Sequence, residues 1–267
     1  MPSSTSASPV RVHPDAPQVR VLPDAASLGA AAAAAVAGAL RESLDRQPTV
    51  RVAFAAAPSQ QPTLAALAAE PGIDWRRVTA FHLDEYLGLG PEAPERFGAW
   101  LRRTFFDLVP LGAVHLIETG PDAEEAARRY AALLAQAPLD LVCLGIGVNG
   151  HLAFNDPPVA DLSDPADVKT VELDEVCRRQ QVDDGSFATL AEVPRRAVTL
   201  TVPRLLAAGR LFCMVPGAHK RDAVRRALLD PVGAACPATA LRTHQDCTLF
   251  LDSAAASALP PEVTRGG

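Results

Sequence analysis

The stretch LDLVCLGIGVNGHLAFNDPP (residues 139–158) begins as an apolar run and ends in polar residues and prolines. Its first half has the length and character of a buried strand in a parallel sheet. Its three glycines have the G-x-G-x-x-G spacing of a dinucleotide-binding turn: Gly145, Gly147 and Gly150. His151 and Asp156, by contrast, are typical of acid–base chemistry. The stretch therefore raises two alternatives, a nucleotide site and a site for a sugar.

The nucleotide hypothesis needs a helix directly after the last glycine, because the amides at the helix N-terminus hold the pyrophosphate. Here Gly150 is followed by HLAFNDPPVADLSDP, in which Pro157 and Pro158 prevent a long helix. The glycines also come late in the chain, after several strand–helix units. We therefore expect no nucleotide cofactor. The glycines allow a tight turn, which leaves His151 to be explained.

Outward from this stretch, apolar runs that favour strands alternate with segments that favour helices. Strands are expected at 18–22, 49–57, 77–85, 112–117, 139–145, 167–174, 197–202, 210–216 and 247–252, and helices at 23–47, 62–70, 95–108, 122–136 and 218–229. This alternation predicts an α/β fold: a doubly wound, mainly parallel, Rossmann-like sheet with helices on both faces. We expect a single domain over 17–255, a disordered N-terminal tail at 1–16 and a C-terminal tail at 256–267.

Composition excludes several classes of function. The 267 residues are 48% hydrophobic and carry a net charge of −6, with no run of Lys or Arg, so nucleic acid is not an expected partner. No segment has the length of a membrane span, and the N-terminus lacks the pattern of a secretory signal. The five cysteines are odd in number and form no C-x-x-C pair. We therefore expect reduced thiols in the cytoplasm, with no structural metal and no cofactor.

In doubly wound sheets the ligand crevice lies at the carboxyl ends of the strands. Four segments turn polar at such ends, namely 56–61, 81–86, 145–157 and 216–220. We expect them to converge on one site.

Two of these segments resemble one family. FHLDEYLGL (81–89) resembles the F-x-x-D-E-Y-x-G-L segment of glucosamine-6-phosphate deaminases, and LGIGVNGHLAFNDP (144–157) resembles their G-x-G-x-D/N-G-H-x-A/G-F-N-E-P segment. Residues 193–228 and 236–252 continue the resemblance, which spans 18–255 in order. The wider superfamily includes 6-phosphogluconolactonases, which carry D-E-R where this chain has D-E-Y and usually lack the Phe-Asn of AFN. The resemblance thus implies the deaminase–isomerase branch, within carbohydrate metabolism.

The resemblance implies catalytic roles for residues of both motifs. Asp84 would move a proton at carbon-2 of the open-chain amino sugar, helped by a desolvated pocket that raises its pKa. His151 would open the sugar ring, because imidazole titrates near neutrality. Asn149 and Asp156 would hold His151. Asn149 cannot ionise, and Asp156 is one methylene shorter than the usual glutamate, which leaves its reach to His151 open.

Glu85 and His82 flank the expected base. Glu85 alternates to the other strand face and is expected to be structural or to orient groups at the site; it is counted among the candidate substrate-binding residues. His82 shares a face with Asp84 and could line the pocket, or it could be a core or surface histidine.

The match weakens where the family binds phosphate. The family has a glycine-rich turn after the second strand, whereas this chain has AAAPSQQPT (55–63), without glycine and with Pro58 removing an amide donor. Ser59 and Gln60 are the expected substrate-binding donors there.

The family's phosphate-binding arginine would fall near Asp184, where this chain has no arginine. Arg178 or Arg179 could substitute from another turn. Lys220 follows a strand at the position of a family lysine and is the remaining expected contact to substrate.

The sequence leaves four functions open. The first is an isomerase/deaminase for an amino-sugar phosphate. The others are the same chemistry on a different, unphosphorylated sugar, a lactonase-type hydrolase, and a non-enzymatic sugar-binding regulator. The presence of both Asp84 and His151 argues against the last, because binding alone needs no proton-transfer pair. The expected partner is a small sugar phosphate, and a homo-oligomer remains open.

Overall fold

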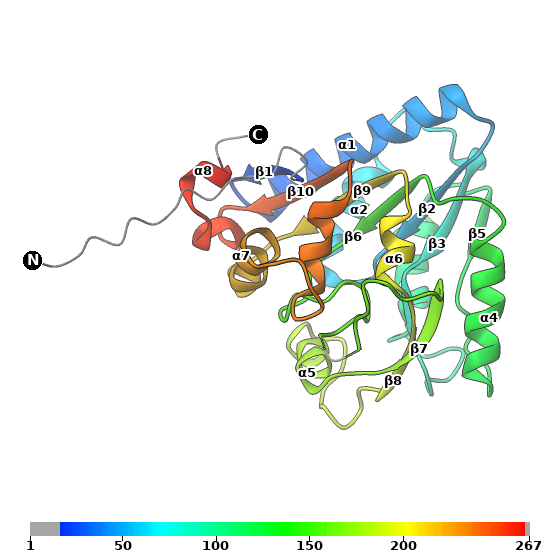
Figure 1. Cartoon of the computed structure of the whole chain (residues 1–267). Helices are drawn as coiled ribbons and strands as arrows, with labels where there is room; N and C mark the ends of the chain where they lie inside the picture. The colour runs from blue at the N-terminus through cyan, green and yellow to red at the C-terminus, as the bar shows by residue number, and fades with distance from the viewer. Residues whose placement is uncertain (1–16, 158, 265–267) are drawn as a thin grey trace, which may run out of the picture.

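The centre of the molecule is a seven-stranded parallel sheet, seen in a computed structural model that describes residues 17–157 and 159–264 (Figure 1). The strand order is β1-β10-β9-β6-β2-β3-β5. The strands are β1 (Gln18–Leu22), β2 (Val50–Phe54), β3 (Val78–His82), β5 (Ala113–His115), β6 (Leu141–Leu144), β9 (Arg210–Val215) and β10 (Cys247–Asp252). Each lies within a range that the sequence predicted.

Helices cover both faces of this sheet, because side chains along each central strand alternate between two apolar layers. Val52 and Phe54 face one layer, whereas Ala53 faces the other. The helices are α1 (Ala25–Arg46), α2 (Gln61–Ala68), α3 (Phe97–Leu101), α4 (Ala123–Leu134), α5 (Glu175–Asp183), α6 (Val202–Leu206), α7 (Arg221–Leu229) and α8 (Pro261–Thr264). Helices α1 and α2 lie on the first layer, and α4, α6 and α7 lie on the second. The predicted doubly wound α/β fold is confirmed.

The strand order places a crevice at the middle of the sheet. From β2 the chain adds β3 and β5 on one side, then returns to add β6, β9 and β10 on the other side of β2. The carboxyl ends of β2 and β6 are therefore neighbours from which the chain leaves in opposite directions. Such a switch point is where ligands bind in doubly wound sheets.

A second, three-stranded sheet departs from the prediction. β4 (Asp84–Tyr86), β8 (Arg196–Leu200) and β7 (Val168–Glu172) pair antiparallel in the order β4-β8-β7. The expected single strand at 77–85 breaks at Leu83, whose carbonyl accepts a hydrogen bond from the amide of Leu200. The strands at 167–174 and 197–202 are correct as strands, but they leave the main sheet.

Smaller differences lie at helices and ends. Helix α5 was not predicted, and the expected helix at 95–108 is divided into α3 and a wider helical turn, Arg102–Phe106. Residues 255–258 and 261–264 form short helices, and Leu259 and Val263 pack against the core, so the predicted tail boundary at 255 is too early. The predicted tail at 1–16 lies outside the described residues. Among the described helices, none combines the length and apolar character that a membrane crossing requires.

Candidate active site

A polar pocket lies at the switch point. Its walls come from residues 55–60 after β2, 83–84 after β3, 145–154 after β6 and Lys220 after β9. These are the four segments expected to converge, since neighbouring parallel strands end at the same edge of the sheet. Five of the predicted site residues line it: Ser59, Gln60, Asp84, His151 and Lys220.

Asp84 begins β4, directly beyond the end of β3. Pairing of β4 with β8 places it opposite Thr199. The residue is 5% exposed. Burial raises the pKa of Asp84 well above its ordinary value, and the carboxylates of Glu85 and Asp156 raise it further. Because the charged form is disfavoured, Asp84 is a stronger base than an aspartate in water.

His151 is held at one ring nitrogen by two side chains. Its Nδ1 lies 2.8 Å from Oδ1 of Asn149 and 2.9 Å from Oδ1 of Asp156. The Asn149 amide in turn donates to the same Asp156 oxygen at 2.8 Å. The shorter Asp156 side chain therefore does reach His151. With Nδ1 engaged, Nε2 is the nitrogen available to a ligand in the pocket.

The electrostatics of Asp156 suit this supporting position. Burial by itself raises the pKa of Asp156, but the hydrogen bond and charge of His151 and hydrogen bonds from Asn149 and Cys177 bring it below the ordinary value. An ionised carboxylate beside Nδ1 holds the imidazole ring of His151 in position.

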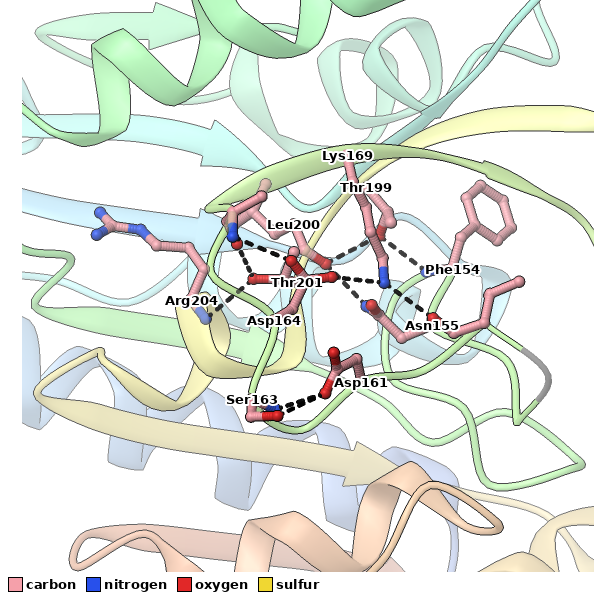
Figure 2. A network of polar contacts seen from close by, with 12 residues as sticks. Phe154, Asn155, Asp161, Ser163, Asp164, Lys169, Thr199, Leu200, Thr201 and Arg204 are labelled. Atoms are coloured by element: carbon pink, nitrogen blue, oxygen red, sulfur yellow. Dashed lines mark hydrogen bonds and ion pairs between the residues drawn. The ribbon is translucent and has the colours of Figure 1, made fainter.

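The loop after β6 is fixed to β8 by buried polar contacts (Figure 2). The Phe154 amide donates to Oγ1 of Thr199 at 3.1 Å, and Nδ2 of Asn155 donates to the Leu200 carbonyl at 2.8 Å. Farther along the same loop, the Lys169 ammonium donates hydrogen bonds to the Val159 carbonyl and to the Asp164 carboxylate. These contacts hold the loop without a helix, so its polar side chains keep their positions in the pocket.

The three glycines of this loop make room for side chains of the site. A Cβ on Gly147 would lie 2.1 Å from the ring of His151, and one on Gly145 would lie 2.9 Å from Nε2 of Gln60. Gly150 has φ +90° and would meet the Cys236 sulfur at 2.4 Å. No helix follows Gly150 within the described part of the loop. The three glycines therefore have the spacing of a dinucleotide-binding motif because each lets a neighbouring side chain pack closely against the loop.

Glu85 points away from the pocket, so the expected substrate contact is not supported. Its carboxylate accepts hydrogen bonds from the amides of Phe97 and Gly98, each at 3.0 Å, and lies 3.4 Å from Nε of Arg96. Burial alone raises the pKa of Glu85, but His82, the Gly98 amide and Arg96 bring it below the ordinary value. Glu85 therefore anchors the start of α3, which delivers Phe97 to the pocket wall.

His82 is a core histidine. It is fully buried, and its backbone and ring contact the Tyr130 hydroxyl. Its Nε2 lies 3.8 Å from Glu85. The expected shared face with Asp84 is lost because the strand breaks at Leu83.

Lys220 closes the pocket on the β9 side. It is 4% exposed, and burial lowers its pKa to about 8, although the Asp184 carboxylate acts in the opposite direction. Among the described residues that line the pocket, it is the one lysine or arginine.

Helix α5 and Asp184, the residue directly after it, supply pocket residues that were not predicted from the sequence. Gln180, Gln181 and Asp184 line the pocket. Neither proposed arginine does: Arg178 donates to main-chain carbonyls, and Arg179 pairs with an acid on its own helix. The available signal was the polar segment 177–187, whose glutamines and aspartates offer hydrogen-bonding groups although it has no arginine at the family's position.

A larger cavity of about 260 Å³ adjoins the pocket. It shares Ala56, Ala57, Phe97 and Asp184 with the pocket and is otherwise lined by Pro58, Pro94, Glu95, Trp100, Arg103, Gly185 and Ser186. The pocket and the cavity therefore share part of their walls.

One described group has the atoms to hold a metal ion. His151, Asp156 and Cys177 offer nitrogen, oxygen and sulfur atoms within 4.8 Å of one another. Burial raises the pKa of the Cys177 thiol well above its ordinary value, which disfavours the thiolate that metals bind. Nδ1 of His151 is already engaged by Asn149 and Asp156. The group suits a hydrogen-bonded chain better than a metal centre.

The switch-point pocket and its proton-transfer groups define an α/β enzyme. The sequence pattern of the family described as "Glucosamine-6-phosphate isomerases/6-phosphogluconolactonase" matches residues 23–250. The chain therefore belongs to this family.

Individual relatives agree. A glucosamine-6-phosphate deaminase from Exiguobacterium sibiricum is 35% identical over 198 residues, covering 73% of this chain and 76% of the relative. A glucosamine-6-phosphate deaminase from Arthrobacter sp. is 35% identical over 250 residues, which cover 91% of this chain and 92% of the relative. A solved structure of a monomeric glucosamine-6-phosphate deaminase is 26% identical, with a TM-score of 0.82 over 90% of this chain and 99% of the other. The structure of a 6-phosphogluconolactonase from Trypanosoma brucei shares the fold, with a TM-score of 0.76 and 20% sequence identity. The match covers 91% of this chain and 99% of the lactonase.

Proposed function

We propose that this protein is an isomerase and deaminase that converts glucosamine 6-phosphate, or a close amino-sugar analogue, to the ketose with release of ammonia. One observation carries the proposal: Asp84, with its raised pKa, and His151, held by Asn149 and Asp156, line the same pocket. The names of the relatives support the same chemistry.

Ring opening is assigned to His151. The anomeric hydroxyl loses a proton as the bond between carbon-1 and the ring oxygen breaks, and the ring oxygen gains one. Nε2 can accept the first proton and return it to the second site, because Asp156 stabilises the imidazolium that exists in between. Asn149 orients the ring through the same nitrogen.

Deamination is assigned to Asp84. Its carboxylate takes the proton from carbon-2 of the open-chain aldehyde, the electrons of that bond form a double bond to carbon-1, and the carbonyl oxygen gains a proton from solvent, which gives an enolamine. Return of the first proton to carbon-1 and loss of one proton from nitrogen to solvent leave an imine at carbon-2. Water adds there and ammonia leaves, so the sum is amino sugar plus water to ketose plus ammonia. The raised pKa of Asp84 makes its carboxylate a stronger base than an aspartate in water, which favours transfer of the proton to it.

Aromatic rings in the pocket wall help to keep water away from the Asp84 carboxylate. Phe97 and Phe154, which both line the pocket, stack with centroids 5.4 Å apart. Tyr86 packs against both of them. Such a wall keeps water from the carboxylate and so favours its protonated form.

Ammonia release tests the proposal. The enzyme is incubated with glucosamine 6-phosphate, other sugar phosphates, unphosphorylated amino sugars and 6-phosphogluconolactone, and ammonia and lactone hydrolysis are followed separately. Ammonia from an amino sugar, lost in Asp84→Asn, is the expected result. Hydrolysis of the lactone without ammonia from any amino sugar would replace the proposal with the lactonase alternative.

We also place the enzyme in the cytoplasm. All five cysteines are unpaired, which agrees with a reducing compartment.

A further inference from the structure

Helix α5 faces the loop after β6 at two points. Oε1 of Gln180 accepts a hydrogen bond from the Val148 amide at 2.9 Å. Cys177 lies three residues earlier on the same helix, so the two side chains share one helix face. The Cys177 sulfur lies within 4.8 Å of a ring nitrogen of His151 and of a carboxylate oxygen of Asp156, and all three residues are buried. The first turn of α5 is therefore packed against the pair to which ring opening is assigned.

The Asp156 carboxylate is held at one oxygen and not at the other. Oδ1 lies 2.9 Å from Nδ1 of His151 and accepts from Nδ2 of Asn149 at 2.8 Å. Oδ2 is buried and has no nitrogen or oxygen donor among the described residues. The last side-chain torsion of an aspartate has only a broad preference, so contacts at Oδ1 alone leave the carboxylate free to pivot. A donor at Oδ2 would fix its plane.

The Cys177 thiol is placed to supply that donor. Burial raises the pKa of this thiol, and the charge of Asp156 and a hydrogen bond to Asp156 raise it further, so the sulfur keeps its proton. The same hydrogen bond contributes to the lowered pKa of Asp156. Because Oδ1 is already engaged twice, the acceptor that remains for the thiol is Oδ2. Even a weak donor here avoids the cost of a buried charged oxygen without a partner.

We propose that Cys177 is a positioning residue for ring opening: its thiol holds Oδ2 of Asp156, so that Oδ1 keeps the His151 ring in one orientation. The inference rests on the proposed function, which assigns ring opening to His151. Cys177 acts through Asp156 and does not itself line the pocket.

The same contacts determine which nitrogen of His151 carries the proton. Nδ1 faces Oδ1 of Asn149 and Oδ1 of Asp156, both of which accept, so Nδ1 is the protonated nitrogen of the neutral ring. Nε2 is then free to take the proton of the anomeric hydroxyl. If the carboxylate pivots, the tautomer protonated at Nε2 is no longer excluded, and that tautomer cannot accept this proton. The ratio of the two tautomers therefore reports the positioning directly.

NMR of the His151 ring nitrogens tests the positioning without any substrate. Long-range proton–nitrogen spectra of isotope-labelled protein are recorded at about pH 9, where an imidazole is ordinarily neutral, and His151→Gln identifies the signals of His151. We expect the wild type and Cys177→Ser to be protonated at Nδ1 alone. Cys177→Ala and the bulkier Cys177→Val should show a mixture of both tautomers, because neither side chain has a donor.

Turnover gives a second readout. Loss of the contact should lower kcat/KM for closed-ring glucosamine 6-phosphate about tenfold in Cys177→Ala, with a smaller change for an open-chain form, because the affected step is ring opening. Cys177→Ser should restore closed-ring turnover to within about twofold of the wild type, since a hydroxyl also donates to the carboxylate.

Cys143 provides the matched control. It is 2% exposed and lies on β6, and burial alone raises the pKa of its thiol. Cys143→Ala removes the same atom without changing a contact of the carboxylate, so the His151 tautomer and the ratio of closed-ring to open-chain turnover should stay as in the wild type. Urea unfolding of all variants separates lost packing from lost positioning.

The outcomes for the inference and for the proposed function are distinct. A single tautomer protonated at Nδ1 in both Cys177→Ala and Cys177→Val, or equal losses of closed-ring turnover in Cys177→Ala and Cys177→Ser, overturns the inference and leaves the proposed function intact. A mixture of tautomers in Cys143→Ala also overturns it, because the effect then comes from lost packing. Absence of ammonia from every amino sugar overturns the proposed function, whereas the NMR spectra still decide whether Cys177 positions the ring.

Discussion

Replacing Lys220 with methionine should stabilise the folded protein at neutral pH. The lysine is 4% exposed, and burial lowers its pKa from 10.5 to about 8. Its charged form is therefore less stable in the folded protein than in the unfolded chain. Methionine keeps the approximate length of the side chain and carries no charge, so Lys220→Met removes this destabilisation and retains most of the packing.

The size of the effect follows from the two pKa values. A shift from 10.5 to about 8 corresponds to about 3 kcal/mol against folding when the lysine is charged in both states. Between these pH values the unfolded chain binds more protons than the folded protein, so wild-type stability rises with pH. The gain from Lys220→Met should be about 3 kcal/mol at pH 7, about 2 kcal/mol at pH 9 and about 1 kcal/mol at pH 10. Binding of a sugar should lose affinity in the same variant, because the ammonium no longer donates.

Urea unfolding of wild type and variant from pH 6.5 to 10 measures this difference. Arg221→Met is the matched control, because Arg221 is the next residue, is exposed and makes a surface ion pair. It should change stability by no more than about 0.5 kcal/mol at any pH. A Lys220→Met variant that is less stable than wild type at pH 7, or whose difference does not vary with pH, would show that the lysine is not held at an energetic cost.

Three variants and one titration test the site further. Asp84→Asn should reduce solvent deuterium incorporation at carbon-2 by about a hundredfold or more. The same variant should be more stable than wild type by urea unfolding, by an amount that grows as pH rises from 3.8, because the raised pKa destabilises the folded carboxylate; retained exchange or lower stability at pH 7 would contradict the assignment. His151→Gln should slow turnover of the closed ring more than turnover of an open-chain form, and equal losses on both would refute the division of roles. Thr199→Val should lower the free energy of unfolding by about 1–3 kcal/mol, because the Phe154 amide loses its acceptor; an unchanged urea midpoint would argue against that contact. Titration with NAD should give no tight binding, because no helix follows Gly150 in the described part of the loop; a submicromolar dissociation constant would overturn this expectation.

Local patterns were sufficient to predict the strands of the main sheet and the convergence of Asp84 and His151 on one pocket. Apolar runs such as 139–145 predict buried strands from residue type alone, and parallel strands end at a common edge for geometric reasons. Asp84 and His151 follow two such runs, so their convergence could be expected before any coordinates. Pro157 and Pro158 similarly excluded a nucleotide-binding helix, because proline removes a donor and clashes with the preceding turn.

The partners of these residues depended on the tertiary structure. Whether Glu85 faces sugar or protein is decided by the break at Leu83 and by the amides of α3, neither of which is visible in strand alternation. The place of Asp184 in the pocket wall likewise required α5 to lie across the pocket, because the distance between α5 and Lys220 is set by chain segments far apart in sequence. Residue type and spacing thus indicated which groups could transfer protons in the pocket. Only the packing of distant elements decided which groups face the substrate, since burial and charge balance are properties of the assembled pocket.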